Sequence, residues 1–173
     1  MGIVVNAISG ADIAAIVNNN IDGAIDLSDK GVKEFFIALA GKVGKEKISV
    51  LRIWSHGATH RRDGSAYNKG NIHFGKDQVD NDSIKDFESF LGILTPMLDN
   101  MSRVELRGCQ SALGSGAKMM LRLAAIWKTE VQGSDRSQPL LTWTPPVYAA
   151  RPGAPALSGA NIIEYNDPSF KRH

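Results

Sequence analysis

A cysteine and a histidine each follow a short apolar segment and stand next to a glycine. Cys109, the only cysteine of the chain, comes directly after Gly108, and His56 comes directly before Gly57. A thiolate is a strong nucleophile, and a nearby imidazole can take or hold its proton. Either residue alone is more often structural, because a lone cysteine in a core is usually inert and a histidine before glycine is often only a turn residue. Together they indicate nucleophilic catalysis if the fold brings them to one place.

The segments around these two residues predict the elements that must position them. Two apolar runs, residues 47–54 and 103–107, indicate strands, and a helical pattern over residues 84–99 lies between them. Strands that alternate with helices predict an α/β fold with a mostly parallel sheet and helices on both faces. Ligands bind beyond the carboxyl ends of such strands. If the two strands are neighbours, about 4.8 Å apart, His56 and Cys109 lie within a few ångströms of each other.

The rest of the chain alternates in the same way. Ser28 is the expected N-cap of a second helix, and Pro96 is expected to kink or end the helix that contains it. Residues 57–70 are polar and predict a long loop. The remaining predicted elements are strands over residues 3–8, 71–75, 129–133 and 161–165, and helices over residues 10–17, 30–43 and 117–127.

The segment at about residues 139–160 is rich in proline. Five of the seven prolines lie between Pro139 and Pro155, together with Trp143 and Tyr148. Proline cannot donate a backbone hydrogen bond, so this segment cannot form a central strand or an ordinary helix. It is either a loop over the sheet or a tail. We hypothesise that it covers the site as an inhibitory flap.

Two charged residues interrupt the apolar strands at equivalent places. Arg52 lies four residues before His56, and Glu105 lies four residues before Cys109. On neighbouring parallel strands these two side chains share one face and one depth. A charge inside a covered sheet is costly unless it is paired. We therefore predict an Arg52–Glu105 ion pair that sets the register of the two strands.

Length and composition exclude several classes of protein. A chain of 173 residues with 43% apolar and 22% charged residues is typical of one globular domain, and a net charge of +2 does not favour nucleic-acid binding. No apolar run approaches the roughly 18 residues of a membrane span, and the first residues lack the basic leader of a secretory signal. We expect a cytoplasmic protein, or one exported without a Sec-type signal. A single cysteine excludes an internal disulfide, and His60 and His73 lack metal-ligand spacing.

The two motifs resemble the signature of the caspase-like cysteine peptidases, in which one apolar strand ends in His-Gly and a second ends in Cys. The stretches that carry the resemblance are residues 51–57 and 104–109. Residues 106–113 are most similar to the separase and CHAT branch and to the self-cleaving domains of bacterial toxins. The resemblance covers about residues 47–135.

The resemblance implies a three-layer α/β sandwich formed by a single domain over residues 1–173, with a dyad of His56 and Cys109 and no cofactor or metal. It also implies that the backbone amides of Gly57 and Cys109 hold the oxyanion. Asp135 is the residue expected to bind a basic side chain directly before the scissile bond. The substrate implied is a polypeptide.

The leading hypothesis is therefore a cysteine endopeptidase that cuts after Lys or Arg. The first alternative is a catalytically inactive module of the same fold that binds peptides or proteins in the same cleft. The second is a domain regulated by an anion such as an inositol phosphate, as in the toxin relatives. A solvated loop is the simpler interpretation of the basic residues that this second alternative needs. They are Arg61, Arg62, Lys69 and Lys76.

Overall fold

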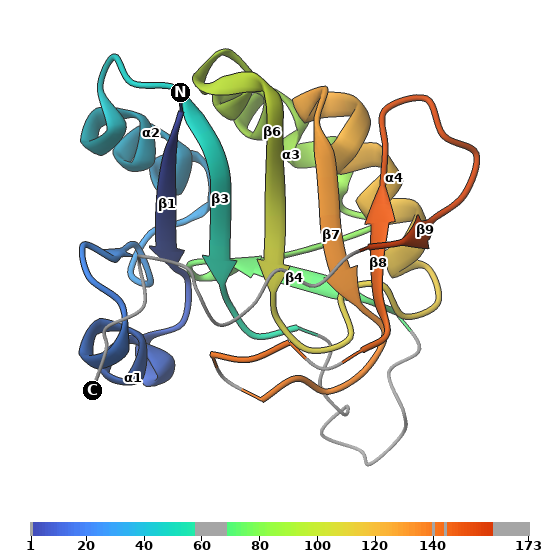
Figure 1. Cartoon of the computed structure of the whole chain (residues 1–173), viewed down its shortest axis with the longest axis horizontal. Coiled ribbons are helices and arrows are strands. Elements are labelled where there is room, and N and C mark those ends of the chain that lie inside the picture. Colours follow the sequence, from blue (N-terminus) through green and yellow to red (C-terminus); the bar gives the residue numbers. More distant parts are fainter. Residues whose placement is uncertain (1, 58–68, 140, 144, 161–173) are drawn as a thin grey trace.

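A seven-stranded, mostly parallel sheet forms the centre of the molecule (Figure 1). The computed structural model describes residues 2–57, 69–139, 141–143 and 145–160. The strands of the sheet are β1 (Ile3–Ile8), β2 (Ile25–Asp26), β3 (Ile48–Trp54), β6 (Leu98–Arg107), β7 (Glu130–Ser134), β8 (Val147–Ala150) and β9 (Ser158–Gly159). Their order is β2-β1-β3-β6-β7-β8-β9; all neighbours from β2 to β7 are parallel, and β8 and β9 add in antiparallel fashion. The predicted α/β class with a mostly parallel sheet is confirmed.

Helices and one hairpin connect these strands. The elements are α1 (Ala11–Asn20), α2 (Val32–Val43), α3 (Ile84–Leu91), the 3-10 helix η1 (Gly92–Met97), α4 (Gly116–Trp127), and the antiparallel pair β4 (Asn71–Phe74) and β5 (Asp77–Asp80). Pro96 lies in η1, so the α-helix ends before it, as its sequence predicts. Within the described residues, no helix is both long and apolar enough to cross a membrane.

The N-terminus of α2 differs from the prediction. Ser28 does not cap this helix, because its hydroxyl donates to the carboxylate of Asp26 instead, at 2.6 Å. The helix begins at Val32, whose amide donates to the carboxylate of Asp77 on β5 at 2.8 Å. The cap thus comes from a residue far away in the sequence, which local sequence patterns cannot reveal.

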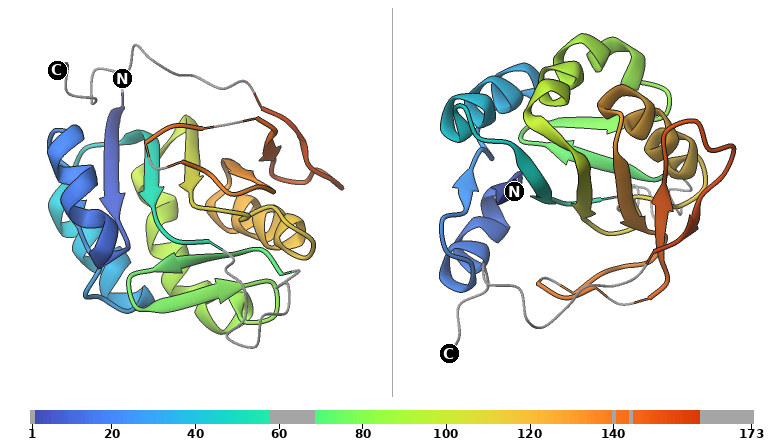
Figure 2. Two further views of the ribbon diagram at one scale, coloured as in Figure 1. Left: turned by 90° about the horizontal axis from the view of Figure 1, so that it is seen from below. Right: turned by 45° about the horizontal axis from the view of Figure 1, so that its top comes forward.

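The two faces of the sheet are covered differently. α2, α3 and α4 pack on one face, over fully buried apolar side chains such as Leu51, Ile53 and Leu106. Successive residues of a strand point to opposite faces, so Arg52 and Trp54 lie on the other face. There α1 packs against Trp54, and the segment that follows β7 crosses the sheet on the side opposite α3 and the β4–β5 hairpin (Figure 2).

β3 and β6 are neighbours in register. Arg52 stands opposite Glu105, and Trp54 stands opposite Arg107. His56 and Cys109 therefore lie two residues beyond the last residue of their own strands, at the same edge of the sheet. The adjacency on which the site prediction depends is confirmed.

β8 corrects the prediction that the proline-rich segment is only a loop or a tail. The four residues of β8 pair with β7 on one side and with β9 on the other. The nearest prolines, Pro146 and Pro152, lie just outside the strand, so all four of its residues can donate backbone hydrogen bonds. The strand predicted over residues 161–165 and most of the loop predicted over residues 57–70 lie outside the described residues.

Candidate active site

The carboxyl ends of β3 and β6 meet in a close backbone contact. A Cβ atom added to Gly57 would stand 1.5 Å from the carbonyl oxygen of Cys109. A Cβ atom on Gly108 would also be tight, at 3.1 Å from the carbonyl oxygen of Ser55. Only glycine fits at position 57, because any side chain there would overlap the cysteine backbone. The glycine of each motif thus lets the backbone at His56 approach that at Cys109.

Asp12 holds the imidazole of His56. The Nε2 atom of His56 lies 2.8 Å from each carboxylate oxygen of Asp12. Asp12 is in the first turn of α1, directly after β1, and β1 is the neighbour of β3. The hydrogen bond to His56 is the main reason that the pKa of Asp12 lies below its ordinary value. Asp12 therefore stays anionic near neutral pH and orients the ring.

Two buried serine hydroxyls tie His56 to the β4 strand behind it. Ser55 Oγ donates to the carbonyl of His56 at 2.6 Å and accepts from the amide of His73 at 3.0 Å. Ser9 Oγ donates to the carbonyl of His73 at 2.5 Å and accepts from the amide of Gly75 at 2.6 Å. These bonds fix the ends of β1 and β3 relative to each other through the hairpin, and with them the separation of the acidic residue and the imidazole.

The thiol of Cys109 faces the backbone of Gln138. Cys109 is partly buried, and the amide of Gln138 donates to Sγ at 3.3 Å, while the carbonyl oxygen of Gln138 lies 3.7 Å from Sγ. In the described part of the chain, no hydrogen bond joins this thiol to His56. Catalytic hydrogen bonds are often long or unformed before substrate binds. Proton transfer between the two groups needs a rotation of one side chain or a bridging water.

Two backbone amides beside the thiol are unused. The N–H groups of Gly57 and Cys109 donate to no acceptor among the described residues. The next amide, that of Gln110, is used, since it donates to the carbonyl of Arg136 at 2.9 Å. The nitrogen of Cys109 lies 2.9 Å from the Cβ position of Gly57, so the two residues that carry these amides are in close contact. Adjacent free amides are what an oxyanion hole requires.

Asp135 lies at a pocket of about 480 Å³ between the start of α4 and β8. Its walls are mostly apolar and include Leu113, Leu121 and Leu157. The hydroxyl of Tyr148 donates to Oδ2 of Asp135 at 3.3 Å. Oδ1 is buried and has no hydrogen-bond partner among the described residues, and the exposed guanidinium group of Arg136 approaches it to 3.9 Å. Lys118 also lines the pocket, which thus combines mostly apolar walls with one carboxylate and one amino group.

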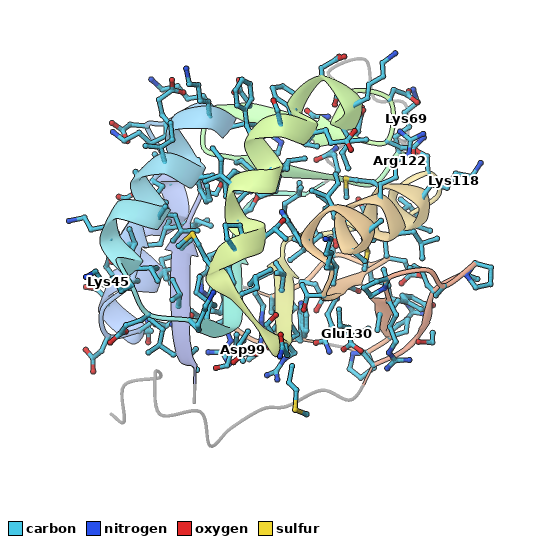
Figure 3. The ribbon with its side chains drawn as sticks, turned by 90° about the horizontal axis from the view of Figure 1, so that it is seen from above. Lys45, Lys69, Asp99, Lys118, Arg122 and Glu130 are labelled. Atoms are coloured by element: carbon cyan, nitrogen blue, oxygen red, sulfur yellow. The ribbon has the colours of Figure 1, made fainter. Side chains whose placement is uncertain are left out.

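Two of the four residues of the predicted basic patch, Lys69 and Lys76, lie in the described part of the chain. Arg61 and Arg62 lie outside it, as does His60. Lys69 Nζ lies 2.5 Å from a carboxylate oxygen of Asp82, and its side chain is at the outer edge of the molecule (Figure 3). Lys76 lies in the turn between β4 and β5, and its backbone amide donates to the carbonyl of Lys30. Nothing in the described chain favours the anion-regulated alternative.

His73 lies near the site but does not build a metal centre. Burial, and next the charge of His56, lower the pKa of His73, so that it is neutral near pH 7. Searched over the described residues, the chain has no group of three or more metal-ligating side chains. A neutral His73 leaves Asp12 as the charged neighbour of His56.

A buried charge cluster lies beneath the site, on the face of Arg52. Arg52 Nε donates to Oε2 of Glu105 at 3.0 Å, with the two side chains 0% and 2% exposed. The predicted ion pair is therefore confirmed. Arg107 also donates to Oε2 of Glu105, at 2.7 Å, and Arg103 donates to Oε1 at 2.8 Å. Burial alone would raise the pKa of Glu105, but Arg107, Arg52 and Arg103 outweigh it and hold that pKa below its ordinary value.

Sequence reasoning missed three residues of this site. Asp12 lies in the helix predicted after the first strand, and its match to His56 depends on the β1–β3 pairing. Arg107 alternates to the same face as Glu105 and could have been added to the ion pair. Gln138 gives no signal, because only its backbone touches the thiol.

The comparisons with known proteins leave the family open. No protein-family model matches the chain. Neither a curated protein nor a solved structure matches it. We therefore infer function from the geometry of the site.

Proposed function

We propose that the chain is a cysteine endopeptidase in which Cys109 is the nucleophile and His56 the acid and base. Asp12 orients His56. The observation that carries the proposal is the meeting of the two motifs at one sheet edge, with Gly57 against the backbone of Cys109. The contact of Asp12 with the imidazole adds an orienting residue to the nucleophile and the base, which completes a triad.

The proposed reaction has two halves. The proton of the Cys109 thiol passes to His56, and the sulfur attacks the carbonyl carbon of the scissile peptide bond. The amides of Gly57 and Cys109 stabilise the oxyanion that forms. His56 then gives its proton to the leaving amine, which departs and leaves a thioester. A water, deprotonated by His56, then attacks the thioester. The carboxylic acid product leaves, and His56 returns the proton to the sulfur of Cys109.

Asp135 supports a preference for a basic side chain before the scissile bond. Its pocket has apolar walls suited to the methylene stem of Lys or Arg and a carboxylate suited to the charged end. The buried Oδ1 atom gains a hydrogen-bond partner when such a cation enters. Ala112 and Leu113, which line the pocket, follow Cys109 closely in the chain.

We infer a three-layer, caspase-like sandwich over the single domain, because helices contact both faces of the sheet and both motifs end parallel, adjacent strands. The polypeptide substrate follows from the proposed chemistry, which acts on a peptide carbonyl.

The rate of alkylation of Cys109 by iodoacetamide tests the dyad. At about pH 6.5 we expect the native thiol to react at least tenfold faster than the same thiol in His56→Ala, since His56 can take the proton of the thiol. His73→Ala, the control at the neighbouring imidazole, should keep this advantage. Equal rates in all three proteins would contradict the dyad.

Peptide hydrolysis tests the activity itself. Fluorogenic peptides with Lys, Arg or Leu before the leaving group should be cut in the order basic before apolar, and Cys109→Ala should abolish cleavage. Asp135→Asn should reduce cleavage after Lys and Arg more than after Leu. Equal loss for all three peptides would remove Asp135 from substrate recognition.

A catalytically inactive binding module is the second candidate. The observation that favours it is the contact of the thiol with Gln138 in place of His56. In that case Cys109→Ala leaves binding of peptides unchanged, and no peptide is cut by the native protein. Calorimetric titration of basic peptides with the native and substituted proteins separates the two candidates.

A further inference from the structure

The backbone of the chain itself covers the candidate nucleophile. The strap, which we define as residues 135–139 and 141–143, follows β7 and crosses the charged face of the sheet (Figure 2). Both polar backbone atoms of Gln138 lie within hydrogen-bonding range of Cys109 Sγ, at 3.3 Å and 3.7 Å. A substrate carbonyl must occupy the space beside Sγ, so it competes with Gln138 for that position.

The first attachment of the strap is a single buried hydroxyl. Ser134 Oγ accepts from the side-chain amide of Gln138 at 2.7 Å and from the backbone amide of Arg136 at 3.2 Å. The same oxygen donates to the carbonyl of Pro146 at 2.9 Å. Ser134 thus binds both the beginning of the strap and the segment that returns to β8.

The second attachment is an aromatic contact at the far end of the strap. The ring centre of Trp143 lies 4.1 Å from the guanidinium carbon of Arg107, and Trp143 is only 5% exposed. Trp54 lies on the same guanidinium group, at 5.4 Å. Arg107 cannot move freely, because it also bonds to the buried carboxylate of Glu105. The strap is therefore fastened to a buried charged group that is held in place from several sides.

The two attachments differ in strength from the contact that covers the thiol. Sulfur is a weak donor and a weak acceptor, so the bonds between Gln138 and Sγ contribute little. A buried cation–π contact and a large buried indole contribute far more. The position of Gln138 over the thiol thus depends on Trp143 rather than on the thiol itself.

We propose that the strap is an autoinhibitory cover of Cys109, held closed by Trp143 on Arg107, and that release of Trp143 opens the site to substrate. As a mode of regulation the inference rests on the proposed function. As a statement about access to the thiol it can be tested without any peptidase activity.

Alkylation of Cys109 at about pH 9, where the thiolate forms without help from an imidazole, measures access alone. Trp143→Ala should react at least about fivefold faster than the native protein, because it loses the contact that holds the strap. Trp143→Phe, which keeps an aromatic face on Arg107, should stay within about twofold of the native rate. Met101→Ala, at a residue 93% exposed, is the control for a change that leaves the strap alone.

A second substitution covers the case in which Trp143→Ala does not fold. Gln138→Ala, at a partly buried position, removes the bond to Ser134 Oγ and should also accelerate alkylation. Circular dichroism checks the fold of each variant. A native rate equal to that of a free cysteine peptide, or no acceleration in either folded variant, overturns the cover.

The His56→Ala background separates the two proposals. The acceleration by Trp143→Ala at about pH 9 should persist there, since it reports only access. If the advantage near pH 6.5 is absent from the native protein but the acceleration at pH 9 is present, the peptidase fails and the cover stands. The reverse result leaves the dyad and removes the cover.

Discussion

The two faces of the central sheet are built from the same strands by different interactions. On the helix face, β3 and β6 contribute apolar side chains whose packing is strong but non-directional. On the opposite face they contribute a carboxylate shared by three guanidinium groups. The apolar set is Leu51, Ile53, Val104 and Leu106, and the charged set is Arg52, Arg103, Glu105 and Arg107.

The difference shows what each face specifies. Apolar residues still pack if one strand slides by two residues, whereas the Arg52–Glu105 pair forms in one register only. A slip of two residues would move His56 about 6.6 Å along the strand direction relative to Cys109. The helix face thus supplies packing that tolerates a change of register, and the charged face supplies the alignment that the site needs.

The largest effect is expected for Glu105→Gln, which removes the charge that the arginines share. Breaking a buried ion pair by removing one partner costs about 3–5 kcal/mol, because the remaining charges stay buried. The free energy of unfolding in urea measures the loss. Glu130→Gln is a matched control on the next strand of the same face, where the partner Arg151 is largely exposed, and should cost less than about 1 kcal/mol.

The same variant has a predictable pH dependence. The pKa of Glu105 is lowered in the folded protein, so its stabilisation is fully present above its ordinary value of 4.5 and is lost as pH falls through the lowered pKa. The native protein should therefore lose stability below about pH 4.5, and Glu105→Gln should lose less over the same range. Parallel curves for the two proteins would mean that other carboxylates govern acid unfolding.

The next effect is expected on the helix face. Leu106→Ala removes a fully buried side chain between the sheet and its helices and should cost about 3 kcal/mol. Its loss leaves the register intact, so the ratio of alkylation rates between the native protein and His56→Ala should be the same in this background. Glu105→Gln should lower that ratio if the charged face sets the alignment. Equal ratios in both backgrounds would end the proposed division of roles.

A smaller effect is expected at the rim of the charge cluster. Arg103 bonds to the other oxygen of Glu105, but its side chain is 21% exposed. Arg103→Ala should therefore cost less than about 1 kcal/mol, since water replaces part of the interaction. Urea unfolding measures this loss against that of Arg52→Ala at the fully buried position. A loss as large as that of Arg52→Ala would show that the contribution of each arginine to stability does not depend on its burial.

The sequence predicts the parts of this architecture that follow from periodicity. Alternating apolar runs identify β3 and β6, and equal spacing from His56 and Cys109 identifies the Arg52–Glu105 pair, because strand geometry is regular. The sequence pattern did not predict the strand β8, because its four residues lie between prolines that dominate the local pattern. A strand this short gains its stability from its neighbours rather than from its own residues.

The rest of the site depends on contacts between distant segments. Asp12 meets His56 only because β1 and β3 are neighbours, and Asp77 caps α2 across 45 residues of sequence. The contact of Gln138 with the thiol uses backbone atoms that every residue has. Such contacts produce no characteristic residue type or spacing in the sequence, so they could not be predicted from it.

The smallest effect on stability, with a large effect on chemistry, is expected for Asp12→Asn. The Asp12 side chain is 69% exposed, so its bond to His56 is screened by water and its loss should lower stability by less than about 0.5 kcal/mol. The pKa of Asp12 is lowered, so the carboxylate is charged at every pH above its ordinary value of 3.8 and would lose its charge only in stronger acid. Near neutral pH the substitution therefore removes an anion that orients the imidazole.

Alkylation at about pH 6.5 should then slow several-fold in Asp12→Asn, while the rate at about pH 9, which needs no imidazole, should not change. Asp29→Asn is the matched control, because Asp29 is an acidic residue of the same 69% exposure that pairs with Lys30 and not with a histidine. A slower reaction at both pH values would indicate that Asp12 supports the fold of the site rather than the proton transfer. The dyad depends on two separate alignments. Asp12, in the first turn of α1 after β1, is aligned with His56, and the charge cluster aligns β3 with β6 and so His56 with Cys109. Only the second alignment should be sensitive to Glu105→Gln.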